Sequence, residues 1–149
     1  SKVIVSHEYR VTVNYSKPLA QMITDGGYGW TDSDITPEHF PVKGQGVHEV
    51  GLVLVHLNKG ASTYEVLSAL DARGLRPATI EQLLSFGARY PDEQRKYMIV
   101  ALGSVWCGWG SVCGVPYLWI WSNGSRRNLS INWYGYGRRS GYRFLALRK

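Results

Sequence analysis

The chain has 149 residues, of which 44% are hydrophobic and 19% charged, and its formal net charge is +6. This length supports one domain with a sizeable core, this charge is too low for a disordered chain, and no apolar run reaches the roughly 18 residues that a membrane-spanning helix needs. We therefore expect a single domain over residues 1–149 that does not insert into a membrane. The opening SKVIVSHEYR does not have the form of a signal peptide, which leaves the compartment open.

The first predicted element is a strand over residues 8–16, because apolar side chains alternate there. Tyr9, Val11 and Val13 share one face, so we expect that face to be buried. Residues 17–30 follow as a short helix or turn that ends at its glycines, since glycine readily adopts the left-handed conformation at a helix end.

Residues 31–46 are predicted to form a loop, because proline, glycine and polar residues are frequent there. Residues 47–58 alternate again, but both faces of this second strand are mostly apolar. A strand with two apolar faces is typical of the middle of a sheet.

Two helices are predicted next. Residues 62–75 carry an apolar stripe that ends at Gly74, and residues 76–92 carry a second stripe that begins after Thr79 and stops at Pro91. Threonine is a good N-cap residue, and proline interrupts a helix because it lacks the backbone N–H.

The last third of the chain is predicted to be β structure, with strands over residues 96–104, 117–121, 127–133 and 142–149. Strands at both ends and helices grouped between them predict an α+β fold. We expect two helices packed on small, mostly antiparallel sheets, a long loop-rich C-terminal half, and a last strand that returns beside an early one.

Charge is divided unevenly along the chain. Residues 94–149 contain nine Lys or Arg and no acid, whereas residues 1–93 contain eight basic residues against eleven acidic ones. Such asymmetry often marks a surface for an anionic partner. The cations are scattered among aromatic residues and glycines, which disfavours nucleic acid as that partner.

Two motifs carry a resemblance to a known family. The stretch ALGSVW (101–106), the Gly- and Trp-rich sequence after it and the terminal SGYRFLALRK resemble the C-type-lectin-like fold. The most similar branch is shared by formylglycine-generating (sulfatase-modifying) enzymes and the variable proteins of diversity-generating retroelements of bacteria, archaea and viruses. There, a Gly-Ser-x-Trp-like stretch and a terminal Gly-Phe-Arg-like strand bracket the ligand-facing surface, and residues 103–106 and 141–143 fill those places here. The helix pair over residues 62–92 also resembles the leader of such variable proteins.

The resemblance implies a hypervariable region over about residues 103–149. In these retroelements the adenines of a template become any base in the copied gene, so AAY codons reach Tyr, Ser, Gly, Cys, Arg and Asn but not Lys, Glu, Gln, Met or Trp. No Lys, Glu or Gln lies between Lys96 and Lys149. Trp109 requires a different template codon, AGG. The presumed variable positions, all in the reachable set, are Cys107, Gly108, Gly110, Ser111, Val112, Cys113, Gly114, Tyr134, Gly135, Tyr136, Gly137, Arg138, Arg139 and Ser140.

The resemblance further implies a ligand-binding protein that is not an enzyme and uses no metal or cofactor. Its binding surface would be two loop groups, about 106–117 and 134–142, with strand residues contributing. Tyrosine and tryptophan offer large contact areas at a small entropy cost, and serine and glycine adapt to a ligand. The expected ligand is another protein of unknown identity, and the oligomeric state stays open. The predicted site residues are Trp106, Cys107, Gly108, Trp109, Gly110, Ser111, Val112, Cys113, Tyr117, Trp119, Trp121, Tyr134, Tyr136, Arg138, Arg139, Ser140 and Tyr142.

A fixed apolar frame would support this surface. Burial as strand filler is the favoured interpretation for Trp119, Trp121 and Trp133, whereas the Gly-rich stretch favours exposure of Tyr134, Tyr136, Arg138, Arg139 and Tyr142. The predicted frame residues are Leu102, Val105, Pro116, Leu118, Leu129, Trp133, Phe144 and Leu145.

An alternative function is a copper-dependent oxidase of the formylglycine-generating kind, with Cys107 and Cys113 as Cu(I) ligands. The sequence departs from that family, because five residues separate the cysteines instead of four and no acid follows Glu93. Two thiols without a nearby histidine do not make a zinc site. The lack of carboxylates in residues 94–149 also disfavours calcium-dependent sugar binding.

Overall fold

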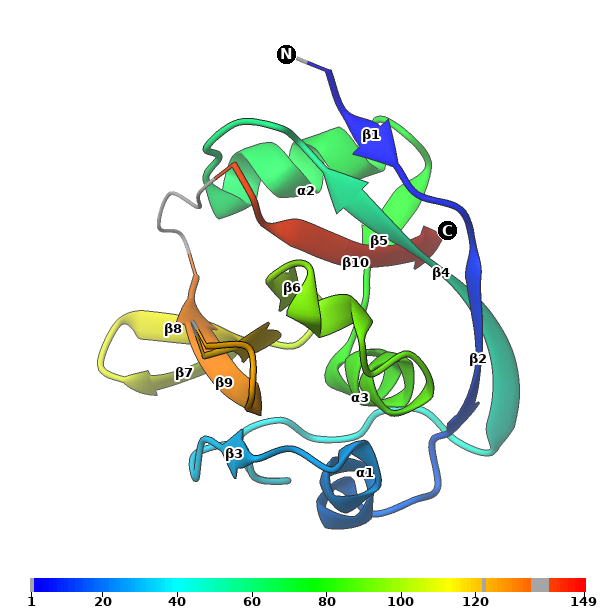
Figure 1. Cartoon of the computed structure of the whole chain (residues 1–149), viewed down its shortest axis with the longest axis vertical. Helices are drawn as coiled ribbons and strands as arrows, with labels where there is room; N and C mark the ends of the chain where they lie inside the picture. The colour runs from blue at the N-terminus through cyan, green and yellow to red at the C-terminus, as the bar shows by residue number, and fades with distance from the viewer. Residues whose placement is uncertain (1, 122, 135–139) are drawn as a thin grey trace.

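A computed structural model describes residues 2–121, 123–134 and 140–149 of the chain. In these residues ten strands form one mixed sheet, which three α-helices accompany (Figure 1). The α+β class is therefore confirmed. The helices are α1 (Leu19–Gly26), α2 (Thr63–Asp71) and α3 (Ile80–Arg89), followed by the 3₁₀ helix η1 (Glu93–Arg95). The strands are β1 (Ile4–Val5), β2 (Tyr9–Asn14), β3 (Trp30–Thr31), β4 (Val47–His56), β5 (Leu75–Pro77), β6 (Ile99–Val100), β7 (Trp106–Trp109), β8 (Val112–Ile120), β9 (Arg127–Trp133) and β10 (Arg143–Arg148).

The sheet follows the order β1-β4-β10-β6-β8-β9-β3, with β2 on β4, β5 on β10 and β7 on β8. Within the described residues only the pairs β10–β6 and β3–β9 are parallel, so the expectation of a mostly antiparallel arrangement is confirmed. The last strand, β10, lies antiparallel to the early strand β4, as predicted. The prediction of several small sheets is wrong, because the strands join in one sheet. The segment after Pro18, predicted as a short helix or turn, forms a third helix beside the two that were expected.

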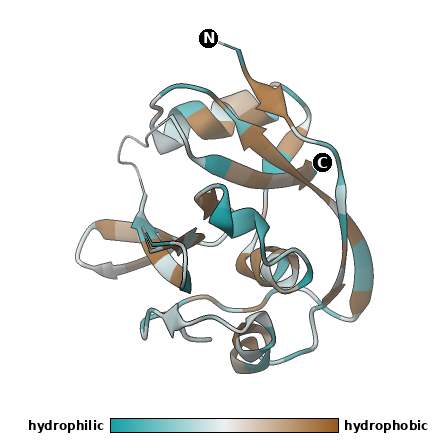
Figure 2. Cartoon of the chain, viewed as in Figure 1, coloured by the Kyte–Doolittle hydropathy of each residue, from teal (hydrophilic) through white to brown (hydrophobic). Residues whose placement is uncertain are grey.

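Alternating side chains of the same strands enter two different hydrophobic cores. Figure 2 shows the run of hydrophobic residues along β4, one of these strands. Leu54 of β4 and Leu145 of β10 belong to the first core, with α1 and α3, whereas Val55 and Phe144 belong to the second core, with α2. Successive residues of a strand point to opposite faces of a sheet. The first core therefore lies on one face of the sheet and the second core on the other.

The helix boundaries follow local capping. Ser62 and Glu65 form a capping box at the start of α2, in which the Ser62 hydroxyl accepts from the Glu65 N–H at 3.2 Å. At α3 the Thr79 N–H donates to the Gln82 side chain at 2.9 Å. Gly27 ends α1 at a φ of 63°, the left-handed conformation expected of a closing glycine.

Residues 106–117 were expected to form a loop, and this prediction is wrong. They form the hairpin of β7 with the first part of β8, in which Trp109 pairs with Val112 across the turn residues Gly110 and Ser111. Gly110 has a φ of 67°, and a two-residue hairpin turn of this kind favours glycine at its first central position. Frequent glycines here mark a turn between strands rather than a loop.

The predicted frame residues are buried with two exceptions. Val105 is 41% exposed and Trp133 is 40% exposed, so neither is interior. Trp133 is the last residue of β9, where the core no longer covers the strand. Trp121, for which burial was favoured, is exposed, and Trp119 is half-buried. No helix among the described residues is both long enough and apolar enough to cross a membrane.

Candidate functional site: an uncovered aromatic face of the sheet

The second core covers only part of its face of the sheet. Val100 of β6 belongs to that core, and it pairs with Phe144 on one side and with Tyr117 of β8 on the other. Paired residues on neighbouring strands point to the same face. Tyr117 therefore points to the α2 side of the sheet, and by alternation along β8 so does Trp119. Trp121 directly follows β8, and its ring lies against that of Trp119.

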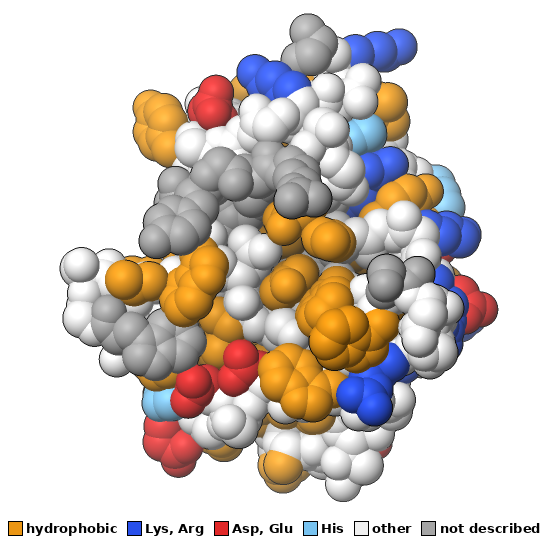
Figure 3. All heavy atoms as spheres, turned by 60° about the vertical axis from the view of Figure 1, so that its left-hand side comes forward, with side chains coloured by type: hydrophobic (Ala, Val, Ile, Leu, Met, Phe, Trp, Pro, Cys, Tyr) orange, Lys and Arg blue, Asp and Glu red, His pale blue; other side chains and the backbone are white. Residues whose placement is uncertain are grey.

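Further side chains extend this face on both sides of β8. Met98 precedes Val100 by two residues and Tyr142 precedes Phe144 by two, whereas Trp30 pairs with Asn128, which pairs with Trp119. Figure 3 shows hydrophobic side chains gathered at the centre of this side of the molecule. We call this surface the aromatic face and define it as Trp30, Met98, Tyr117, Trp119, Trp121, Tyr134 and Tyr142.

Three aromatic rings form a ladder along β8. The centroids of Tyr117 and Trp119 are 6.3 Å apart with rings 11° from parallel, and those of Trp119 and Trp121 are 5.2 Å apart at 60°. The Trp119 Nε1–H donates to the Ser130 Oγ of β9 at 2.7 Å, which fixes the orientation of the indole. Trp121 remains 46% exposed and Trp30 45% exposed. The ladder is thus a fixed platform with exposed tryptophans at its end and side.

Tyr117 is the most buried end of the ladder and stays neutral at physiological pH. Burial raises the pKa of Tyr117 to about 12, the nearby Tyr142 hydroxyl adds to the rise, and the Asn132 amide opposes it. Asn132 Nδ2 also donates to the Tyr142 hydroxyl at 3.4 Å. Tyr117 and Tyr142 therefore offer neutral hydroxyl groups at the border between the aromatic face and the second core.

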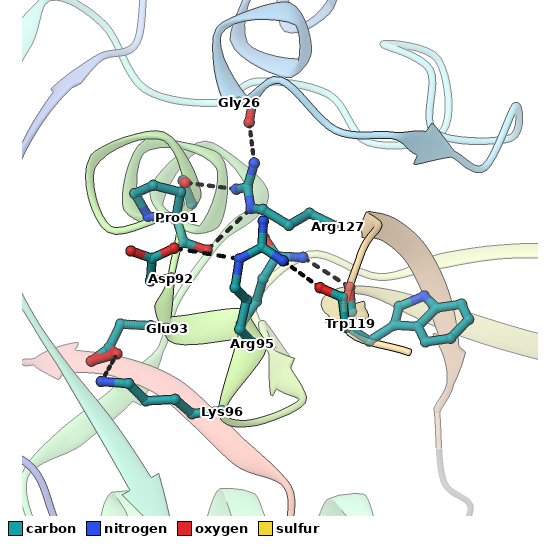
Figure 4. Close-up of polar contacts among 11 residues, drawn as sticks. Gly26, Pro91, Asp92, Glu93, Arg95, Lys96, Trp119 and Arg127 are labelled. Atoms are coloured by element: carbon teal, nitrogen blue, oxygen red, sulfur yellow. Dashed lines mark hydrogen bonds and ion pairs between the residues drawn. The ribbon is translucent and has the colours of Figure 1, made fainter. Parts of the chain in front are cut away.

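Two polar side chains hold the strands of the platform from outside the face (Figure 4). Gln94 Nε2 donates to the carbonyl oxygens of Trp119 at 2.9 Å and Asn128 at 3.1 Å. The Arg127 guanidinium donates to the carbonyls of Pro91, Gly26 and Gly87 and lies over the Tyr28 ring. These contacts tie β8 and β9 to η1, α1 and α3, so the platform is anchored to the helices of the first core.

The hairpin β7–β8 adjoins the aromatic face and contains the disulfide Cys107–Cys113. The Tyr134 N–H donates to the Cys113 carbonyl at 2.8 Å, so the two predicted loop groups meet at this point. Trp106 points the other way, because it pairs with Gly114 and its ring stacks on His39 at 3.8 Å between centroids. Trp106 therefore packs beside the first core and is not part of the aromatic face.

The predicted site residues thus divide into groups. Tyr117, Trp119, Trp121, Tyr134 and Tyr142 lie together, although Tyr134 and Tyr142 are half-buried against the second core rather than exposed. The disulfide lies beside them, and Gly108, Gly110 and Ser111 are exposed in the hairpin. By alternation Val112 points away from the face, and Ser140 is exposed in the turn before β10. Tyr136, Arg138, Arg139 and the Trp109 side chain lie outside the described part of the chain.

Three presumed variable glycines are constrained by their surroundings. A Cβ atom would lie 1.8 Å from Cζ2 of Trp106 at Gly108 and 2.2 Å from Cγ2 of Ile131 at Gly114, and Gly110 has the positive φ described above. Bulkier residues would clash at Gly108 and Gly114 and strain the backbone at Gly110. Variation at these positions is therefore expected to cost stability.

Trp30 and Met98 belong to the aromatic face but were missed as site residues. Trp30 lies on the two-residue strand β3, and its partner Asn128 is far along the chain. Met98 lies just before the two-residue strand β6. Strands this short leave no alternating pattern that would predict which way a side chain points.

The disulfide bears on the copper-oxidase alternative. With Cys107 and Cys113 bonded to each other, neither sulfur is a thiolate, and thiolates are the ligands that Cu(I) prefers. Copper binding would require prior reduction of this bond. Within the described residues, no group of three or more His, Cys, Asp or Glu side chains could hold a metal ion.

A comparison of the chain with protein families, curated proteins and solved structures gave no match.

Proposed function

We propose that this protein is a ligand-binding protein on a C-type-lectin-like scaffold, whose C-terminal surface is diversified by retroelement-templated mutagenesis. Its ligands are other proteins, which it contacts through the aromatic face and the adjoining hairpin. The observation that carries the proposal is the part of the sheet that no helix of the described residues covers, where Trp30, Trp119 and Trp121 lie outside both cores.

Protein ligands fit the chemistry of this face. Tyrosine and tryptophan are enriched among residues that dominate protein–protein affinity, because rigid rings bury large areas at little entropy cost. A monomer rarely exposes a continuous apolar patch without a binding role. The exclusively basic charge of residues 94–149 favours a partner with an acidic rim.

Diversification requires that binding positions change without unfolding the protein. The strand β8 allows this, because one of its sides is buried in the first core and the other points away from that core. Leu118 is fully buried and pairs with the equally buried Leu129, whereas the neighbouring Tyr117, a residue type that AAY codons reach, points to the opposite face. Substitutions at outward positions leave the packing of the first core intact.

The genomic locus provides the test of diversification. We expect a near-copy of the last third of the gene close by, differing where the copy has adenine, together with a reverse-transcriptase gene. Complete sequencing of the locus that finds neither would overturn the retroelement part of the proposal.

A further inference from the structure

Strand β2 has an open edge, because within the described residues it pairs with β4 alone. The Tyr15 N–H donates to the Gly46 carbonyl at 2.8 Å, and these two residues continue the register of β2 with β4. In an antiparallel ladder every second pair of residues exchanges hydrogen bonds. The residues of β2 that alternate with Tyr15 are therefore bonded to β4, whereas the backbone N–H and C=O groups of Arg10, Thr12 and Asn14 point outward.

The chain itself uses both ends of this edge and leaves the middle free. The Tyr90 hydroxyl donates to the Arg10 carbonyl at 2.9 Å, and the Lys17 N–H donates to the Asn14 carbonyl at 3.1 Å. Both contacts agree with the outward direction of these carbonyls. The backbone N–H and C=O of Thr12, an exposed residue, make no hydrogen bond with other residues that the structure describes. Thr12 is thus the centre of an open backbone edge.

A cavity of about 620 Å³ lies beside this edge, between β2 and the helices α1 and α3 (Figure 1). Its lining includes three apolar side chains that are at most 5% exposed, Val11 of β2, Met22 of α1 and Leu84 of α3. The small side chains of Ser85 and Ala88 on α3 border the same space. The volume is within the range of roughly 300–1,000 Å³ that is usual for ligand pockets. The open edge is therefore accompanied by a recess that can receive side chains of a strand lying along β2.

From the open edge and the recess we infer that β2 binds an extended segment of a partner protein, which adds to the sheet as an antiparallel strand opposite Thr12. In strand addition the main chain provides affinity and alternate side chains provide specificity. A segment that alternates threonine and valine has the required chemistry. Its valines lie against Leu84 and Ala88, and its threonines lie beside Thr12 in solvent. Antiparallel pairing is favoured because it is slightly more stable per residue than parallel pairing.

A peptide segment fits this edge better than a second copy of the chain does. In a second copy, the inward side chains of β2, such as Val11, are already covered by the first core of that copy. They could not enter the recess beside Leu84, because their own α3 would occupy that space. The inferred site lies on the first-core face of the sheet, so it does not depend on the aromatic face or on the proposed function.

The test uses the whole chain labelled with ¹⁵N and the peptide acetyl-Lys-Thr-Val-Thr-Val-Lys-amide. On NMR titration we expect the Thr12 amide signal to shift, while the side-chain N–H signal of Trp121, on the aromatic face, stays. The peptide N-methylated at both threonines lacks the donors that point at β2 and should bind at least about tenfold more weakly. The matched control is the peptide N-methylated at both valines, whose amides point away from β2, and it should bind more tightly than the first.

Two variants of the chain test the same edge. Proline at position 12 removes an outward N–H but no hydrogen bond to β4, and edge strands tolerate proline at such positions. Thr12→Pro should therefore fold and lose peptide binding. Ala88→Trp fills the recess from an exposed position of α3 and should also weaken binding, while leaving the backbone of β2 unchanged.

An unchanged Thr12 amide signal, or equal binding of the two N-methylated peptides, would overturn the inference. A dimer of the chain that Thr12→Pro abolishes would also overturn it, because a second copy would then occupy the edge. None of these results bears on the proposed function, which is tested at the gene locus and at the aromatic face.

Discussion

At the scale of single residues, Arg127 shows how a charged side chain can organise a platform that it does not belong to. It is largely buried and donates to three backbone carbonyls from α1, α3 and Pro91. Its closest sequence neighbour, Arg126, is exposed. Nothing in the local sequence distinguishes these two arginines, because the partner Gly26 lies 101 residues away along the chain.

The contrast between the two arginines gives a direct prediction. Arg127→Met should lower the free energy of unfolding by about 2–4 kcal/mol, because three backbone carbonyls, two of them in buried hydrogen bonds, lose a charged donor. The matched control Arg126→Met should change it by less than about 0.5 kcal/mol. Urea denaturation measures both. Equal effects of the two substitutions would show that the Arg127 contacts do not stabilise the fold.

Tyr117 gives a prediction in alkaline solution. Burial raises the pKa of Tyr117 to about 12, above its ordinary value of 10.0, so the folded state favours the neutral phenol. Its contribution to stability is complete below pH 10 and is lost as the pH rises toward 12. Titration of ¹³Cζ-labelled tyrosine by NMR should show this group ionising well above exposed tyrosines, and Tyr117→Phe should remove that signal. Ionisation of Tyr117 near pH 10 would mean that its hydroxyl is solvated.

At the scale of elements, the sequence predicted what depends on local pattern. The alternation of Tyr9, Val11 and Val13 predicted β2 and its buried face, and the N-cap residue Thr79 predicted the start of α3. The hairpin β7–β8 was missed, because its glycines resemble those of a loop and its pairing is visible only in three dimensions. The predicted burial of Trp133 was also wrong, because this residue ends β9 at a point that the core does not cover.

The glycines of the C-terminal strands and turns differ in whether a side chain can replace their hydrogen. Gly114→Ala should destabilise the fold by about 1–3 kcal/mol, because the new methyl group would meet Ile131. Gly141→Ala is the matched control, since nothing lies within 4 Å of a Cβ at that position. Thermal denaturation compares the two. If Gly114→Ala were as stable as Gly141→Ala, position 114 would be open to variation after all.

The two faces of the sheet near β8 are expected to differ in their importance for stability. Trp121→Ala should change the free energy of unfolding by less than about 1 kcal/mol, because its ring is half exposed and outside both cores. Leu118→Ala, in the adjoining strand β8 but on the opposite face, should cost about 2–5 kcal/mol. Denaturation curves measure both, and a large loss for Trp121→Ala would mean that the ladder is part of the structural core.

At the scale of the whole molecule, the candidate site arises from an imbalance in how the helices cover the sheet. α1 and α3 pack on the first face, while α2 covers only the part of the second face near β4 and β10. The remaining strands, β8 and β9 with β3, present the aromatic face. The sequence predicted the fold class and five members of this face, but not Trp30 or Gln94, whose roles depend on contacts between distant segments.

In the proposed function, the outward residues of the C-terminal strands vary while the inward ones hold the fold. Sequencing the last third of the gene across many natural copies tests it most directly. We predict amino-acid changes at outward positions of the hairpin and aromatic face, such as Ser111 and Tyr134, and none at Gly114, Leu118 or Leu129. Changes spread evenly over inward and outward positions, or no changes at all, would contradict the account.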